Sequence, residues 1–209
     1  MWASHSVAAV ASMNRRVPGA PTVATSVACA LSGPTFRTSP RSGLRRGGEA
    51  TGAATAYYQA GGESDVEPAP PDGRSRRRES WMRAVQSSDR TVMCAEREGG
   101  VVGILSMGPS YEADLDTSTA GQLYQIHVRP GIWGQGIGSF LHSAFVQFLR
   151  DASLVTGVLE AWERNSRARA FYARHGWMPD GHHRPGPGNG NYVRMRLSLD
   201  PAVRPCRGG

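Results

Sequence analysis

The chain has 209 residues, a length that allows one ordinary domain together with additional segments. Its net charge is +7, and all 24 basic residues are arginine. Residues 1–78 carry ten arginines against five acidic residues, whereas residues 79–209 carry fourteen against twelve. Because the second segment is nearly neutral, an extended nucleic-acid-binding surface on it is excluded, and no nucleic-acid partner is expected.

The three cysteines, Cys29, Cys94 and Cys206, show neither a CxxC spacing nor accompanying histidine ligands. This sparse set predicts no metal site and fits a reducing, cytoplasmic location. No apolar run approaches the roughly eighteen residues that a membrane span needs, so no membrane partner is expected. The segment Met13–Ser32 contains paired arginines, as some export signals do, but two prolines interrupt its apolar part. The sequence therefore favours the cytoplasm over export.

The first third of the chain has a composition that is unsuited to a packed core. Residues 1–74 are rich in Ala, Gly, Pro, Ser, Thr and Arg and show little periodicity. Such a segment buries too little apolar surface to offset its chain entropy, so we expect a disordered tail or a misannotated start. The folded domain is expected over residues 75–200, and a short C-terminal tail over residues 201–209.

From residue 75 the pattern becomes regular. Residues 76–86 are predicted to form a short helix with one apolar face. The segments Thr91–Glu98 and Val101–Met107 flank the pair Gly99-Gly100. A two-residue glycine turn between apolar runs is typical of an antiparallel hairpin.

The remaining segments alternate between strand and helix patterns. Strands are predicted over Gln122–Val128, Leu154–Trp162 and Tyr192–Leu199, and helices over Ser139–Asp151 and Ser166–His175. A hairpin followed by strand, helix, strand, helix and strand indicates an α/β fold. We expect a mixed, mostly antiparallel central sheet flanked by helices.

A glycine-rich loop separates the strand at Gln122–Val128 from the next helix. Gly134, Gly136 and Gly138 lie in the sequence WGQGIG. Glycines let a backbone approach a ligand, and the first N–H groups of the following helix point into the loop. This arrangement predicts a pyrophosphate cradle for a nucleotide cofactor.

Two other nucleotide sites fit the loop poorly. A P-loop requires a lysine, and the chain contains none. A dinucleotide site requires GxGxxG and an acidic residue about twenty positions later. Glu160 nearly supplies the acid, but the glycine spacing here is GxGxG and too few residues follow for a doubly wound sheet.

Two motifs resemble those of the GNAT N-acetyltransferase superfamily. The sequence VRPGIWGQGIGSFL resembles its pyrophosphate-binding motif, (Q/R)xxGx(G/A), and ERNSRARAFYARHGW resembles the motif that follows it. Their order and spacing also agree, and the resemblance covers about residues 76–200. It implies the GNAT-like acyl-CoA N-acyltransferase fold. The first motif position, Gln or Arg in the standard pattern, is Trp133 here.

The resemblance implies an acyltransferase that moves an acetyl group from acetyl-CoA to a primary amine by direct attack in a ternary complex. The amine could belong to a small molecule or a protein, and both a monomer and a homodimer stay open. No metal cofactor is implied. The implied cofactor contacts are the strand residues Ile126, His127 and Val128, the loop residues Gly134, Gln135, Gly136, Ile137, Gly138 and Ser139, and Asn165 and Tyr172 from the second motif.

The resemblance also implies catalytic roles. Tyr172 is expected near the thioester sulfur as general acid. The resemblance leaves the base open, and Glu160 is the first candidate in this sequence. Some family members use a glutamate on the cofactor strand, but the corresponding position here is Gln122, which cannot act as a base. Glu163 and His127 are the other candidates, acting directly or through water.

Structural roles compete with these functional ones. Asn165 could simply cap a helix, and Tyr172 could be a core aromatic residue. The pair His182-His183 is expected in a surface loop. Because residues 1–73 show no clear first strand and helix of the family, a non-catalytic acyl-CoA-binding domain of the same fold is the alternative function.

Overall fold

The computed structural model describes residues 37–39, 73–97, 100–186 and 189–200. Most of residues 1–74, and all of residues 201–209, lie outside this part, so the expected tails stay predictions. The helices are α2 (Gly73–Gln86), α3 (Ile137–Asp151) and α4 (Ser166–Arg174). The strands are β1 (Arg37–Ser39), β2 (Thr91–Arg97), β3 (Gly100–Pro109), β4 (Ala120–Val128), β5 (Thr156–Trp162), β6 (Met178–Pro185) and β7 (Asn191–Ser198). None of the helices described is both long and apolar enough to cross a bilayer.

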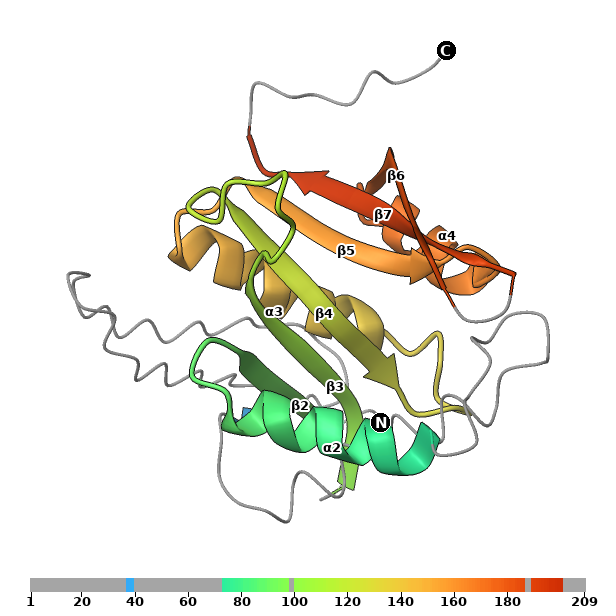
Figure 1. The fold of residues 1–209 in the computed structure, drawn as a ribbon. Helices are drawn as coiled ribbons and strands as arrows, with labels where there is room; N and C mark the ends of the chain where they lie inside the picture. The colour runs from blue at the N-terminus through green and yellow to red at the C-terminus, as the bar shows by residue number, and fades with distance from the viewer. Residues whose placement is uncertain (1–36, 40–72, 98–99, 187–188, 201–209) are drawn as a thin grey trace, which may run out of the picture.

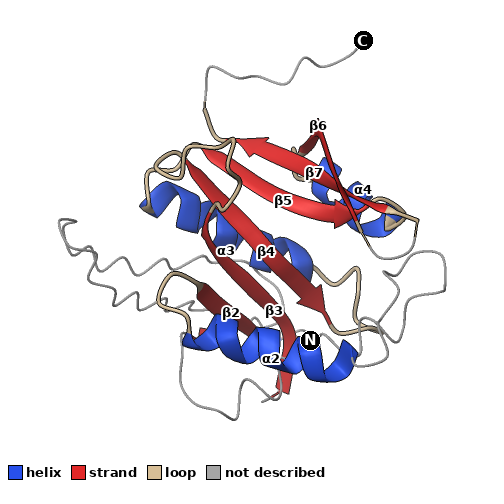
Figure 2. Cartoon of the chain, viewed as in Figure 1, coloured by secondary structure: helices blue, strands red, loops and turns tan. Residues whose placement is uncertain are grey.

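The strands form one seven-stranded sheet in the order β1-β2-β3-β4-β5-β7-β6. All neighbours are antiparallel except β4 and β5, which are parallel. Helix α2 lies in front of the sheet in Figure 1 and α3 lies behind it; Figure 2 separates the helices and strands by colour. The predicted mixed, mostly antiparallel sheet flanked by helices is confirmed.

Two strands were not predicted from the sequence. Strand β1 falls inside the expected tail and pairs with residues 94–96 of β2. Strand β6 contains His182 and His183, which were expected in a loop; their side chains are exposed, as predicted. Almost every residue of β6 is exposed, so it lacks the alternation of apolar and polar residues by which a half-buried strand is recognised.

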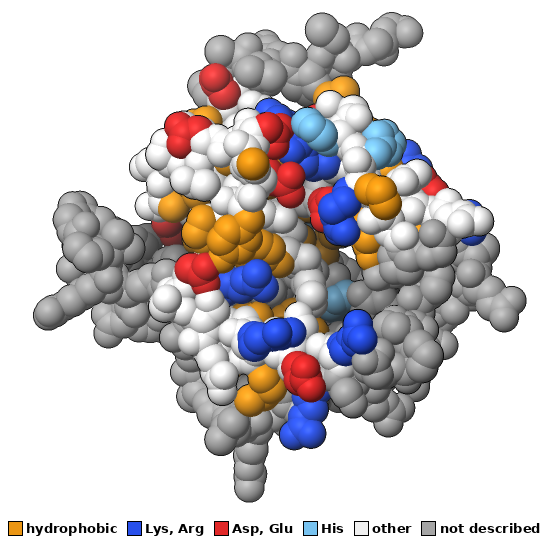
Figure 3. Space-filling model, viewed as in Figure 1, with side chains coloured by type: hydrophobic (Ala, Val, Ile, Leu, Met, Phe, Trp, Pro, Cys, Tyr) orange, Lys and Arg blue, Asp and Glu red, His pale blue; other side chains and the backbone are white. Residues whose placement is uncertain are grey.

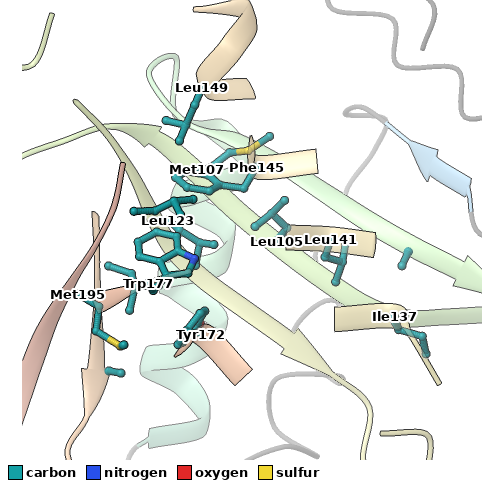
Figure 4. Packing of buried hydrophobic residues seen from close by; sticks show 14 of the residues in the cluster. Leu105, Met107, Leu123, Ile137, Leu141, Phe145, Leu149, Tyr172, Trp177 and Met195 are labelled. Atoms are coloured by element: carbon teal, nitrogen blue, oxygen red, sulfur yellow. The ribbon is translucent and has the colours of Figure 1, made fainter. Parts of the chain in front are cut away.

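The main core lies between α3, α4 and the sheet. Ile137, Leu141, Phe145 and Leu149, spaced by four residues on one side of α3, are all buried in it (Figure 4). Glycines on the sheet let this helix come close. A Cβ atom at Gly121 or Gly157 would stand 2.5 Å from Leu149 or 3.0 Å from Phe145, respectively.

A second, smaller core lies on the other face of the sheet. Helix α2 buries Trp81 and Ala84 there against Val92 and Cys94 of β2 and Ile104 of β3. The two faces of the sheet are therefore covered by different helices. We call them the α3 face and the α2 face.

Strand β4 contains a bulge in its centre. Its register with β3 pairs Met107 with Leu123 but Ser106 with Gln125, so that Tyr124 is an additional residue. A bulge of this kind shifts the alternation of side chains along the strand.

The shift decides which side chains of β4 lie on the α2 face. Leu123 and Ile126 both pack in the main core on the α3 face, although they are three residues apart. Successive strand residues otherwise alternate between faces. Polar or aromatic side chains therefore occupy the α2 face at Gln122, Tyr124, Gln125 and His127.

An arginine cluster joins the loop between β3 and β4 to the strands β6 and β7. The side chain of Arg194, on β7, is 4% exposed. It donates hydrogen bonds of 2.7 Å to both carboxylate oxygens of Asp114, one of 2.7 Å to Asp180, and one of 3.2 Å to Glu112. These bonds hold the pKa of Asp114 down at about 2. Acidic, arginine and histidine side chains gather on the α2 face in Figure 3.

Replacing Arg194 by alanine should lower the free energy of unfolding by an amount on the order of 2 kcal/mol, because Asp180 would be left largely buried with less compensation. Arg196→Ala is the matched control. Arg196 also donates to Asp180, at 2.8 Å, but its side chain is 40% exposed, and we expect a loss of less than about 1 kcal/mol. Urea unfolding of both variants measures the difference, and equal losses would contradict the role given to Arg194.

Candidate cofactor and catalytic site

Strands β4 and β5 pair over a short distance and then diverge. Their parallel register consists of Ala120–Thr156, Gly121–Gly157 and Gln122–Val158. Beyond these pairs β4 continues to Val128 along β3, and β5 continues to Trp162 along β7. The two strands separate towards their C-terminal ends in Figure 1. The backbone edge of β4 that faces this gap includes the predicted cofactor-strand residues 126–128.

The glycine loop lies at the end of β4, where the strands have separated. Gly131, Gly134 and Gly136 have φ angles of 84°, 79° and 83°, which other residues rarely adopt. A Cβ atom at any of these three positions would meet no atom of the described residues within 4 Å. The loop is therefore held in a shape that glycine permits, and the described part of the chain leaves space in front of it.

Helix α3 begins directly after this loop. Gly136 is its N-cap residue, no side chain caps the helix, and the first turn contains no acidic residue. The first N–H groups of such a helix attract an anion. The side chain of Ile137 is buried, so only its backbone can contact a ligand. The loop and the helix start have a geometry suited to an anion. The predicted cofactor contacts there stay predictions for Gly134, Gln135, Gly136, Ile137 and Ser139.

Gly138 serves packing as well. A Cβ atom there would lie 3.2 Å from the ring of Phe171 on α4. The absence of a side chain at Gly138 thus lets α3 approach α4. Its predicted contact with the cofactor would involve only the backbone N–H.

The second motif places Asn165 at the start of α4. Its side-chain oxygen accepts a hydrogen bond of 2.9 Å from the N–H of Ala168, so Asn165 is the N-cap of this helix. The capping role is therefore observed. The expected contact of Asn165 with the cofactor stays a prediction.

Tyr172 lies on α4, on the α3 face of the sheet. It is 7% exposed and packs in the main core with its ring 5.8 Å from that of Trp177 (Figure 4). Leu123 of β4 and Leu159 of β5 belong to the same core. Tyr172 is thus a core aromatic residue beside both strands that border the gap, which is compatible with the predicted role of its hydroxyl.

The carboxylate of Glu160 is engaged by an arginine. Arg184 donates to both carboxylate oxygens, at 2.9 and 2.7 Å, and its guanidinium also lies over the ring of Tyr192. To accept a proton from an amine, Glu160 would have to give up part of this ion pair. Glu163 accepts a hydrogen bond of 3.2 Å from Asn191 and lies beyond the end of β5.

His127, a candidate base, and Gln122, at the position where some family members have a glutamate, both lie on β4. Gln122 accepts a hydrogen bond of 3.1 Å from the backbone of Tyr111. The ring of His127 is buried against Trp81 of α2, with 6.1 Å between ring centroids. Only the backbone of His127 is therefore placed to follow the cofactor.

The predicted catalytic pair lies on opposite faces of the sheet. Leu159 and Ala161 belong to the core on the α3 face, so Glu160, between them, points to the α2 face. Tyr172 lies on the α3 face. A shared role for the two residues in catalysis therefore stays a prediction, which would require both to act through the region where β4 and β5 are not paired.

Three contacts around the glycine loop were not predicted from the sequence. Arg97 of β2 donates a hydrogen bond of 2.7 Å to the side chain of Gln135. The indole N–H of Trp133 donates to the carbonyl of Val128 at 2.9 Å, and the guanidinium of Arg167 lies 4.1 Å from the centre of the Trp133 ring. The contacts of Arg97 with Gln135 and of Arg167 with Trp133 join residues far apart in sequence, so no local pattern predicts them. The bond from Trp133 to Val128 spans only five residues within the loop.

A pair of stacked histidines lies just behind the first turn of α3. The rings of His142 and His175 are 4.3 Å apart, and His175 is within 3.1 Å of the hydroxyl of Ser139. The indole N–H of Trp177 donates to Nε2 of His142 at 2.8 Å. His142 is therefore an acceptor at Nε2, and burial, with the neighbouring His175, lowers its pKa to about 4.

We expect His142 to make the stability of the protein depend on pH. Its pKa rises from about 4 in the folded chain to about 6.5 in the unfolded one, so the unfolded chain binds the extra proton between these values. The free energy of unfolding should therefore fall as the pH is lowered from 6.5 towards 4. His142→Gln keeps an acceptor for Trp177 but does not titrate. Urea unfolding at pH 7 and pH 4.5 should show a loss smaller by about 1–2 kcal/mol in this variant.

His175 stays in both proteins, so its own titration, to which Arg174 contributes, is largely common to the two measurements. An equal loss of stability in the wild type and in His142→Gln would contradict a neutral, buried His142.

The sequence and the fold both match known proteins. A model of the Acetyltransferase (GNAT) family matches residues 51–177. A relative named as an uncharacterized N-acetyltransferase of Archaeoglobus fulgidus is 27% identical over 101 residues, which are 48% of this chain and 69% of the relative.

Two solved structures illustrate the likeness in fold. An aminoglycoside 6'-N-acetyltransferase complexed with coenzyme A is 14% identical with a TM-score of 0.59, covering 80% of this chain and 98% of the other. A protein from Salmonella typhimurium, solved with its cofactor acetyl-CoA, is 15% identical with a TM-score of 0.59, covering 83% and 99%. The family match spans more than half of the chain, from before α2 to the end of the second motif, and the chain belongs to the GNAT acetyltransferase family.

Proposed function

We propose that this chain is an N-acetyltransferase that binds acetyl-CoA and transfers the acetyl group to a primary amine within a ternary complex. The observation that carries the proposal is the gap between β4 and β5, which opens directly onto the glycine loop and the start of α3. An extended pantetheine arm can lie along the free edge of β4, as an added strand would. The pyrophosphate would then meet the N–H groups of residues 134–139.

Relatives of the same fold support this choice of cofactor. Two similar structures contain coenzyme A or acetyl-CoA. The cytoplasmic location that we propose for the reaction rests on the sparse cysteines of the sequence. The proposed acceptor is an amine of a small molecule or of a protein.

The proposed reaction uses groups from both faces of the sheet beside the gap between β4 and β5. The amine nitrogen attacks the thioester carbonyl, and a backbone N–H of β4 stabilises the oxyanion that forms. When the carbon–sulfur bond breaks, the Tyr172 hydroxyl protonates the departing thiolate. Glu160 takes the proton that the amine loses, which requires Arg184 to release one carboxylate oxygen. Holding both substrates in the gap provides much of the remaining acceleration.

Substitution of Gly136 by valine should weaken coenzyme A binding at least about tenfold, because a side chain would enter the open space in front of the loop. Gly181→Val is the matched control. Gly181 also has a positive φ, of 87°, and open space around it, but it lies in β6. Both variants should lose similar stability through backbone strain, and only Gly136→Val should lose affinity in calorimetric titrations.

Substitution of Tyr172 by phenylalanine should keep the packing against Phe171 and Trp177 while removing the proposed acid. We expect kcat to fall about 100-fold or more, with little change in the affinity for acetyl-CoA. Release of free thiol from acetyl-CoA, measured with a panel of amines, gives the rate. Wild-type protein that binds acetyl-CoA but turns over none of the amines would favour a non-catalytic acyl-CoA-binding domain.

A further inference from the structure

We propose that Arg167 binds the pyrophosphate of the cofactor and that Trp133 holds its guanidinium in place for this contact. The inference rests on the proposed function, since it concerns the same coenzyme A site. It assigns a side chain to a cradle that otherwise consists of backbone groups.

The cradle needs positive charge. A pyrophosphate diester carries two negative charges, and residues 134–139 include no cationic side chain. The N-terminus of α3 provides only about half a positive charge. A guanidinium nearby would supply the balance and could form two parallel hydrogen bonds with phosphate oxygens.

Trp133 is fixed immediately next to the cradle. It directly precedes Gly134, and its indole N–H donates to the carbonyl of Val128 at 2.9 Å. This hydrogen bond anchors the ring between the end of β4 and the glycine loop. The ring can therefore serve as a platform for a side chain from another element.

The guanidinium of Arg167 stacks on the Trp133 ring. Arg167 is the second residue of α4, and its Cζ lies 4.1 Å from the centre of the Trp133 ring. A guanidinium held by an aromatic face keeps its N–H groups available at its edge. Stacking also reduces the conformational entropy that the side chain would lose on binding an anion.

The position of Arg167 on α4 is a second argument for an anion. A cation in the first turn of a helix opposes the helix dipole, and an acidic residue is favoured there. The first turn of α4 contains no acidic residue, and neither does that of α3. Arg167 and the start of α3 therefore both contribute positive charge beside the glycine loop, which a pyrophosphate would neutralise.

The test is calorimetric titration of the full chain with coenzyme A. Arg167→Ala should weaken binding about tenfold or more. Arg169→Ala is the matched control: it removes the same charge from the same helix, but Arg169 donates to the carbonyl of Glu163 at 3.1 Å and should change affinity less than about threefold. Trp133→Phe keeps the aromatic face without the indole N–H and should give an intermediate loss. Circular dichroism checks that the variants are folded.

Truncated ligands locate the contact. Dephospho-coenzyme A lacks the 3′-phosphate but keeps the pyrophosphate, so the loss caused by Arg167→Ala should be the same as with coenzyme A. A loss seen with coenzyme A alone would move the guanidinium to the 3′-phosphate and overturn the inference. Equal affinity of the wild type and Arg167→Ala would overturn it as well and leave the proposed function standing. Failure of the wild type to bind coenzyme A would instead refute the proposed function.

Discussion

The incomplete pairing of β4 with β5 is the constraint on which the rest of the site depends. A sheet normally satisfies its backbone groups through continuous pairing, and this one does so from β1 to β4 and from β5 to β6. Between these two blocks the register ends after Gln122 and Val158. Backbone donors and acceptors at a sheet edge attract an extended partner, and the proposed partner is the cofactor arm.

Helix α3 holds the two blocks in this arrangement. It crosses behind the short paired region, where Gly121 of β4 and Gly157 of β5 let Leu149 and Phe145 pack closely against both strands. The C-terminal half of α3 thus packs on the region where β4 and β5 are paired, and the N-terminus of the same helix adjoins the glycine loop. The separation of the strands and the position of the cradle are therefore determined together.

The sequence predicted what depends on local patterns. The apolar stripe of α3 and the cap at Asn165 each reveal themselves within a few residues, and both helices, α3 and α4, were found with errors of at most two residues at their ends. The pairing of β2 with β3 was also predicted, but Gly100, which was expected in the turn, pairs with Arg97 as the first residue of β3. Strand β6 was missed because nearly all of it is exposed. The contacts Trp133–Arg167, Arg97–Gln135 and His142–Trp177 join distant segments, so they became visible only when the chain was folded.

The bulge at Tyr124 divides β4 into two segments that obey opposite rules of alternation. Odd-numbered residues face the core before it, and even-numbered ones do so after it. Deleting one of the two residues between Leu123 and Ile126 would leave both of these on the α3 face, because a regular strand alternates with a period of two. It would instead remove the bulge, and with it the local bend that a bulge gives a strand. The additional residue lies just beyond Gln122, the last residue of β4 that pairs with β5, so the bend of the bulge coincides with the point at which the two strands begin to diverge.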